Sequence, residues 1–192
     1  MKQVYLFLFT ITLFVVACAP KASQDSATTT NTATTKAVNG TEVLKDGIPS
    51  PLKRMSFSKN DAKIVVQYGS PSVKGRTVWG DLVPFDEVWR TGANEATTFE
   101  TSTALTVQGK ELPAGKYGLF TIPTEDGKWT VIFNSVHEQW GAYEYDKSKD
   151  VLRVNATAVN TETVTEAMEF ALEGTNIVLK WDKLTLPIKV SL

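Results

Sequence analysis

Hydrophobic and polar residues alternate in short segments along most of the chain. Near the C-terminal end, for example, Leu186, Ile188 and Val190 are separated by Pro187 and Lys189. A period of two places successive side chains on opposite faces of a β-strand, one face toward a core and the other toward solvent. The same pattern, in whole or in part, occurs at residues 64–68, 97–102, 105–107, 117–122, 129–133, 152–156, 168–172 and 177–181.

Turn-forming residues separate these segments. Asp126-Gly127 and Glu173-Gly174-Thr175-Asn176 are two of the breaks, and such residues are typical of hairpin connections between antiparallel strands. Scarcely any stretch has the 3.6-residue period of an amphipathic helix. The pattern therefore predicts an all-β fold of about nine or ten strands, arranged as an antiparallel β-sandwich or jelly-roll-like domain over residues 46–192.

The first seventeen residues have the composition of a signal peptide. Lys2 supplies a positive charge, and residues 4–17 are apolar apart from two threonines. This run is shorter than the roughly 20 residues that a membrane-spanning helix needs, and it fits a signal-peptide core. It ends in Val15-Val16-Ala17-Cys18, which matches the bacterial lipobox, where the cysteine is diacylated and becomes the new N-terminus. We therefore expect residues 1–17 to be a lipoprotein signal peptide and Cys18 to be lipidated. The alternative is an uncleaved or ordinarily cleaved signal peptide with an incidental cysteine.

Residues 18–45 separate this signal from the alternating segments. Within them, residues 23–35 contain no aromatic side chain and a single charge. Such a stretch buries too little apolar surface to offset the entropy of ordering it, so we expect a flexible tether. Two or three acyl chains on Cys18 suffice to hold a protein on a bilayer. The sequence thus predicts a cell-envelope protein that is lipid-anchored to a bacterial membrane, either periplasmic or exposed at the surface.

Composition excludes several kinds of site. The chain has 192 residues, of which 42% are hydrophobic, enough for one domain to build its own core. It contains one cysteine and one histidine, which excludes an intramolecular disulfide and the usual Cys/His zinc site. The net charge of −1 argues against a nucleic-acid partner, because such proteins carry a basic excess. We therefore expect no metal and no cofactor.

Residues 75–95 depart from the alternating pattern and combine aromatic with charged and amide side chains. Tryptophan faces suit stacking on sugars, so the ligand expected here is a glycan, a peptide or another envelope protein. Five residues of this segment and two aromatic residues further along form the candidate ligand-binding set: Trp79, Trp89, Arg90, Asn94, Glu95, Trp140 and Tyr143.

The same region allows two other interpretations. In the first it is structural: Arg90 and Glu95 flank the turn 91–94 closely enough for an ion pair, and Trp89 is a core plug. In the second it is catalytic, because hydrolysis of a glycosidic bond needs two carboxyl groups. The carboxyl candidates are Asp81, Asp86, Glu87, Glu95 and Glu100.

A Ser-His-Asp site would have to use His137, the sole histidine. This residue lies in a polar segment, and the chain has no Gly-x-Ser-x-Gly motif. We therefore assign no catalytic residue. A non-enzymatic binding or structural domain is favoured over the alternative, a glycan-acting hydrolase with paired carboxylates.

Six segments of the chain form an ordered set of motifs. They are YGSPSVKGR (68–76), VWRTGANE (88–95), LPAGKY (112–117), WGAY (140–143), DVLRV (150–154) and the stretch from LKW (179–181) to PI (187–188). Together they resemble the hallmark segments of domain-of-unknown-function family 2911, from about residue 50 to the C-terminus. The resemblance implies a bacterial β-rich domain, often behind a signal peptide, with no assigned activity. It also implies an arginine at the position of Ser70, where this chain departs from the pattern.

Overall fold

The computed structural model describes residues 39–59 and 62–191. The predicted signal peptide, the lipidation of Cys18 and most of the predicted tether lie outside the described residues. Within the described ranges, no helix is long and apolar enough to cross a membrane.

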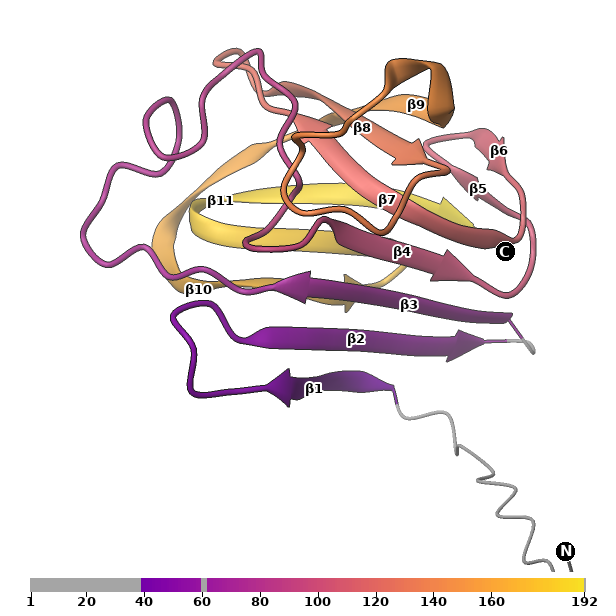
Figure 1. Cartoon of the computed structure of the whole chain (residues 1–192), viewed down its shortest axis with the longest axis horizontal. Helices are drawn as coiled ribbons and strands as arrows, with labels where there is room; N and C mark the ends of the chain where they lie inside the picture. The colour runs from indigo at the N-terminus through magenta and orange to yellow at the C-terminus, as the bar shows by residue number, and fades with distance from the viewer. Residues whose placement is uncertain (1–38, 60–61, 192) are drawn as a thin grey trace, which may run out of the picture. The chain divides into compact units, whose positions relative to one another are not determined.

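Two antiparallel sheets make up the domain (Figure 1). In spatial order, the larger sheet contains β1 (Gly40–Lys45), β2 (Leu52–Lys59), β3 (Ala62–Gly69), β4 (Thr97–Thr101), β7 (Gly115–Ile122), β8 (Lys128–Asn134) and β9 (Asp150–Thr157). The smaller sheet contains β10 (Val159–Glu173), β11 (Asn176–Ser191), β5 (Leu105–Val107) and β6 (Lys110–Leu112). The only helical turn in the described part of the chain is η1 (Lys147–Lys149). The predicted all-β, sandwich-like fold is confirmed, with 11 strands in place of nine or ten.

The two sheets enclose a hydrophobic core. Trp129, Val131 and Phe133 of β8 are fully buried in it. Phe170 of β10 and Leu186 of β11 belong to the same cluster and come from the smaller sheet. The alternating segments of the sequence therefore mark the side of each strand that faces the core, and burial of these large side chains is the main stabilising contribution.

The outer face of β7 and β8 is covered as well. Ile132 is out of phase with the core residues of β8, yet it is fully buried with Phe120 and Ala96. Ala142 and Tyr145, from the segment between β8 and β9, pack against these three residues. This packing holds residues 135–149, which we call the β8–β9 segment, against the larger sheet.

β11 bends back on itself. Asp182 has a left-handed φ of 54°, and the N–H of Val190 donates to the carbonyl of Thr175 at 2.9 Å. The two ends of β11 therefore lie side by side (Figure 1). Its two arms correspond to the two short strands that the sequence predicted at 177–181 and 186–190. Trp181 immediately precedes the bend and is buried, with 1% of its surface exposed.

The first strand lies in a stretch that the sequence assigned to the tether. Residues 40–45 form β1, so the predicted boundary at residue 45 is wrong for the described part of that stretch. All six side chains of β1 are exposed, and the strand is held by backbone pairing with β2 and by an ion pair of 3.1 Å between Arg54 and Glu42. A strand that buries no side chain leaves no alternating pattern in the sequence.

Candidate functional site

A pocket of about 530 Å³ opens among the loops that follow β3 and β8, beside β11. This volume lies within the range of small-molecule sites in proteins. Four of the seven predicted ligand-binding residues line it: Trp89, Arg90, Asn94 and Tyr143. Arg76, Glu87 and Trp181 are also part of the lining.

The other three predicted residues lie outside the lining. Trp79 is half-buried and packs against the core. Glu95 and Trp140 form an isolated antiparallel β-bridge with each other, and both side chains are exposed. The structure therefore brings the predicted set together as one neighbourhood, but only part of it faces the pocket.

Four tryptophans form one cluster, and two of them, Trp89 and Trp181, line the pocket. The ring of Trp79 lies edge-on at centroid distances of 5.7 Å from Trp89, 4.9 Å from Trp129 and 5.6 Å from Trp181. Trp89 also stacks on Trp181 at 5.9 Å. Such aromatic contacts add stability beyond the area they bury. Since Trp89 is only 8% exposed, it fills the role of a core plug and offers little free face for stacking on a sugar.

The backbone around Arg90 is fixed on both sides. Trp89 exchanges two backbone hydrogen bonds with Thr121 of β7, at 2.8 and 2.9 Å, and its indole N–H donates to the carbonyl of Gly92 at 3.2 Å. Thr91 is fully buried with a φ of 54°, a left-handed conformation that is strained for a β-branched residue. The hydroxyl of Thr97 donates to the carbonyl of Thr91 at 2.8 Å and helps to hold it there.

Two glycines allow this loop to lie against the end of β3. The N–H of Ala93 donates to the carbonyl of Gly69 at 3.2 Å. A Cβ atom at residue 69 would lie 2.1 Å from the carbonyl oxygen of Ala93, and one at Gly92 would lie 2.8 Å from the hydroxyl of Thr97. Both positions therefore require glycine, which explains these two glycines in the motifs at 68–76 and 88–95.

Among the described residues, Arg90 has no partner for its charge. Its buried Nε makes no hydrogen bond, and no carboxylate of the described residues lies within 4.0 Å of its guanidinium. Burial lowers the pKa of Arg90, and an electrostatic interaction with Tyr143 opposes that effect. An arginine that is partly removed from water and has no charged partner is unfavourable for folding, because nothing compensates the lost hydration of its charge.

The ion pair expected between Arg90 and Glu95 is not formed, and that prediction is wrong. The turn between them is tied to other parts of the chain instead: Ala93 bonds to β3, and the carbonyl of Asn94 accepts from the N–H of Gly141 at 3.0 Å. Glu95 is consequently paired with Trp140 through the backbone and has an exposed side chain.

The predicted carboxyl groups do not converge on the pocket. Glu87 is part of the lining, but Asp81, Asp86, Glu95 and Glu100 are not. All five carboxyl residues are exposed. His137 is also absent from the lining, and the described residues contain no group of three His, Cys, Asp or Glu that could hold a metal ion. The geometry therefore provides one carboxyl group where glycoside hydrolysis needs two.

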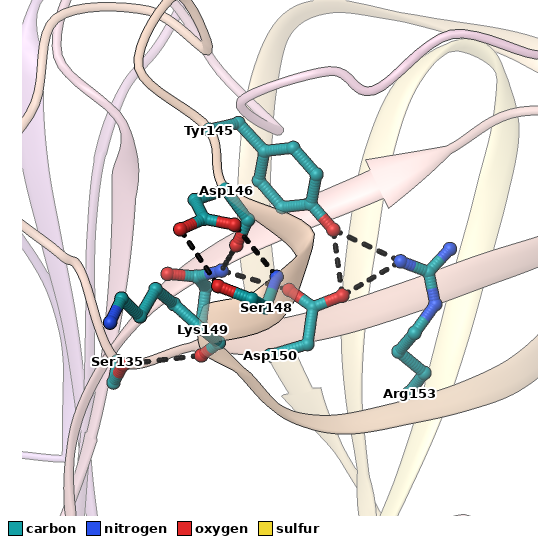
Figure 2. A network of polar contacts seen from close by, with 8 residues as sticks. Ser135, Tyr145, Asp146, Ser148, Lys149, Asp150 and Arg153 are labelled. Carbon is teal, nitrogen blue, oxygen red and sulfur yellow. Dashed lines mark hydrogen bonds and ion pairs between the residues drawn. The ribbon is translucent and has the colours of Figure 1, made fainter.

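A polar network that the sequence did not predict anchors the β8–β9 segment (Figure 2). Asp150 accepts hydrogen bonds from the hydroxyl of Tyr145 and from Nη1 of Arg153, both at 2.7 Å, and from Nδ2 of Asn134 at 2.8 Å. Burial, followed by the bond to Asp150, raises the pKa of Tyr145 to about 12.

Further contacts close the same end of the segment (Figure 2). Asp146 accepts from the N–H and the hydroxyl of Ser148, both at 2.8 Å, and so caps η1. The N–H of Ser135 donates to the carbonyl of Lys149 at 2.9 Å. Because Ala142 and Tyr143 lie within this segment and line the pocket, the network positions one wall of the site. The available sequence signal was the motif at 150–154, which contains both Asp150 and Arg153.

Comparison with known proteins identifies a family. No curated protein and no solved structure matches the chain. The family model described as "Protein of unknown function (DUF2911)" matches residues 50–190, most of the chain and nearly all of the sandwich. The resemblance carried by the six sequence motifs is therefore confirmed, and this chain belongs to the DUF2911 family.

Proposed function

We propose that the chain is a non-enzymatic binding protein displayed on a membrane, and that its ligand occupies the pocket around Arg90. The observation that carries the proposal is the guanidinium of Arg90, which lines the pocket and has no charged partner among the described residues. Unpaired charges in partly buried positions reduce stability, so their retention is typical of groups kept for function.

The loop that carries Arg90 supports the same interpretation. Thr91 is held in a strained conformation, and strain of this kind is concentrated at binding and catalytic sites. The loop packs closely at Gly69 and Gly92, and hydrogen bonds of Trp89 and Thr91 hold it in this position. A group fixed in advance loses little entropy when a ligand binds, and pre-organisation of this kind increases affinity.

Binding is better supported than hydrolysis. A glycosidase of either stereochemical class uses two carboxyl groups on opposite sides of the scissile bond. Glu87 alone among the predicted carboxyl residues lines the pocket. The volume of the pocket suits a small molecule, or the part of a glycan, peptide or envelope protein that enters it.

The experiment uses the full chain and a variant whose pocket is filled. Ala142→Trp adds an indole to the lining, and Ala104→Trp makes the same change at an exposed residue outside the pocket. Each protein is incubated with a fractionated bacterial envelope extract, washed and analysed by native mass spectrometry. We expect the unaltered chain and Ala104→Trp to retain a common bound species that Ala142→Trp loses while keeping its circular dichroism spectrum. Equal retention by all three proteins, or retention by none, contradicts the proposal.

The proposed membrane anchor is the acylated Cys18. Its support is the apolar run at residues 4–17 and the lipobox that ends it. In cells supplied with labelled palmitate, the unaltered chain should incorporate the label and fractionate with membranes. Cys18→Ala should do neither, because the acyl chains provide the binding energy for the bilayer. An unlabelled wild-type chain argues against the anchor.

A further inference from the structure

The charges in the pocket lining indicate the class of ligand. Three charged side chains line the pocket: Arg76, Glu87 and Arg90. The guanidinium of Arg76 already donates to the carbonyl of Val73 at 3.0 Å and to that of Ser72. Arg90 has no such acceptor in the part of the chain that the structure describes, and its Nε is buried. The pocket therefore offers one set of charge-bearing donors that the folded chain does not use.

We propose, on the basis of the proposed function, that the pocket recognises a carboxylate group of its ligand through the guanidinium of Arg90. A guanidinium presents its N–H groups as a planar fork that matches the two oxygens of a carboxylate. Bonds between two charged groups are short and stronger than neutral hydrogen bonds. A ligand carboxylate supplies the counter-charge that Arg90 lacks among the described residues, and it accepts from the Nη N–H groups, because Nε is buried and out of a ligand's reach.

The balance of charge favours a single negative charge on the ligand. With Arg76 and Arg90 positive and Glu87 negative, the lining has a net charge of +1. A carboxylate neutralises it, whereas a phosphate dianion would leave one negative charge in excess beside Glu87. A helix N-terminus is a common element of phosphate sites in proteins, and the described residues that line the pocket include none.

The fixed loop determines where the carboxylate binds. The carbonyl of Arg90 accepts from the N–H of Thr97 at 3.2 Å, and the backbone N–H and carbonyl of Trp89 are both hydrogen-bonded to Thr121 of β7. The ligand carboxylate thus meets the guanidinium of a residue whose backbone is fixed, next to the buried indole of Trp89. This indole N–H provides a reporter for binding, since it is present in every variant described below.

The experiment is a titration of the full chain in detergent, followed by the NMR resonance of the Trp89 indole N–H. The probes are sodium acetate and sodium phosphate, with chloride used to hold the ionic strength constant. We expect a saturable shift with acetate and at least tenfold weaker binding of phosphate. Arg90→Gln should weaken acetate binding at least tenfold, as expected for the loss of a charge-assisted contact. Arg90→Lys should bind with intermediate affinity, because it keeps the charge and loses the fork.

Two further variants test the role of charge. Glu87→Gln removes the negative charge of the lining and should tighten acetate binding. Arg54→Gln removes an arginine of β2 that is paired with Glu42 of β1. Arg54 lies outside the pocket, so this variant should leave acetate binding unchanged. An equal effect of Arg54→Gln and Arg90→Gln would show that the protein's overall charge, and not the pocket, attracts the probe, and so overturns the inference.

The outcomes separate the inference from the proposed function. If phosphate binds as tightly as acetate, or if acetate binding survives Arg90→Gln, the carboxylate assignment is wrong while the pocket remains a binding site. If neither probe produces a saturable shift but Ala142→Trp still loses the species captured from the envelope extract, the inference fails and the proposed function stands. If that capture also fails, both are wrong.

Discussion

Removing the charge of Asp150 should destabilise the domain, and Asp150→Asn is the substitution that does so with the least change in shape. The side chain of Asp150 is 6% exposed and accepts hydrogen bonds from three donors, supplied by Asn134, Tyr145 and Arg153. In the variant, an NH₂ group replaces one acceptor oxygen and faces at least one of these donors. Arg153 meanwhile loses its counter-charge.

The size of the loss follows from the burial of the pair. Removing one partner of a fully buried ion pair costs about 3–5 kcal/mol. The side chain of Arg153 is 32% exposed, so water solvates part of the charge that is left behind. We therefore expect a loss of about 2–3 kcal/mol in the free energy of unfolding. For a protein of this size, that loss lowers the melting temperature by roughly 5–10 °C.

The assay is urea unfolding of the full chain, followed by tryptophan fluorescence. Asp126→Asn is the matched control, because Asp126 is also hydrogen-bonded but lies exposed in the loop between β7 and β8. We expect Asp126→Asn to change the stability much less than Asp150→Asn. Equal midpoints for the two variants would falsify the structural role assigned to the network in Figure 2.

Two other properties of the structure lead to measurable effects on stability. Burial raises the pKa of Tyr68 and of Tyr145 to about 12. Since an unfolded tyrosine ionises near pH 10, the stability that these phenols contribute is complete below about pH 10 and is lost as the pH rises through about 12. Chemical unfolding across this range should show the loss, and Tyr68→Phe should reduce it. Gly69→Ala should lower the free energy of unfolding by about 3 kcal/mol, because the added Cβ lies 2.1 Å from the carbonyl oxygen of Ala93. Gly174→Ala meets no atom within 4 Å and should lower it by about 1 kcal/mol, because of the positive φ at this residue. Equal losses in the two variants would contradict this expectation.

The fold could be predicted because strand alternation is a local property of the sequence. Val131 and Phe133 lie at alternating positions of β8 that face the core, and both are fully buried. Ile132 shows the limit of this reasoning: it is out of phase and equally buried, because the β8–β9 segment packs over the outer face of the sheet. The pattern within β8 contains no information about that distant contact. β1 escaped prediction for the opposite reason, since its side chains are all exposed.

The candidate site could be predicted as a region but not as an arrangement. The unusual composition of residues 75–95 located the pocket, four of whose lining residues were in the predicted set. The pairing of Arg90 with Glu95 was inferred from their separation in sequence alone. Their actual positions depend on contacts of the turn with Gly69 and with Gly141, which are distant in the chain. The same is true of Trp181, which reaches the pocket from β11.

The most direct test of a functional role for Arg90 compares two arginines in the ligand-free protein. Arg153→Met leaves the buried carboxylate of Asp150 without its counter-charge, and we expect a loss of about 2 kcal/mol in the free energy of unfolding. Arg90→Met removes a charge that has no partner in the described structure, and we expect the free energy of unfolding to stay unchanged or to rise by about 1 kcal/mol. A loss in Arg90→Met as large as that in Arg153→Met would show that Arg90 serves the fold, and would contradict its assignment to a ligand.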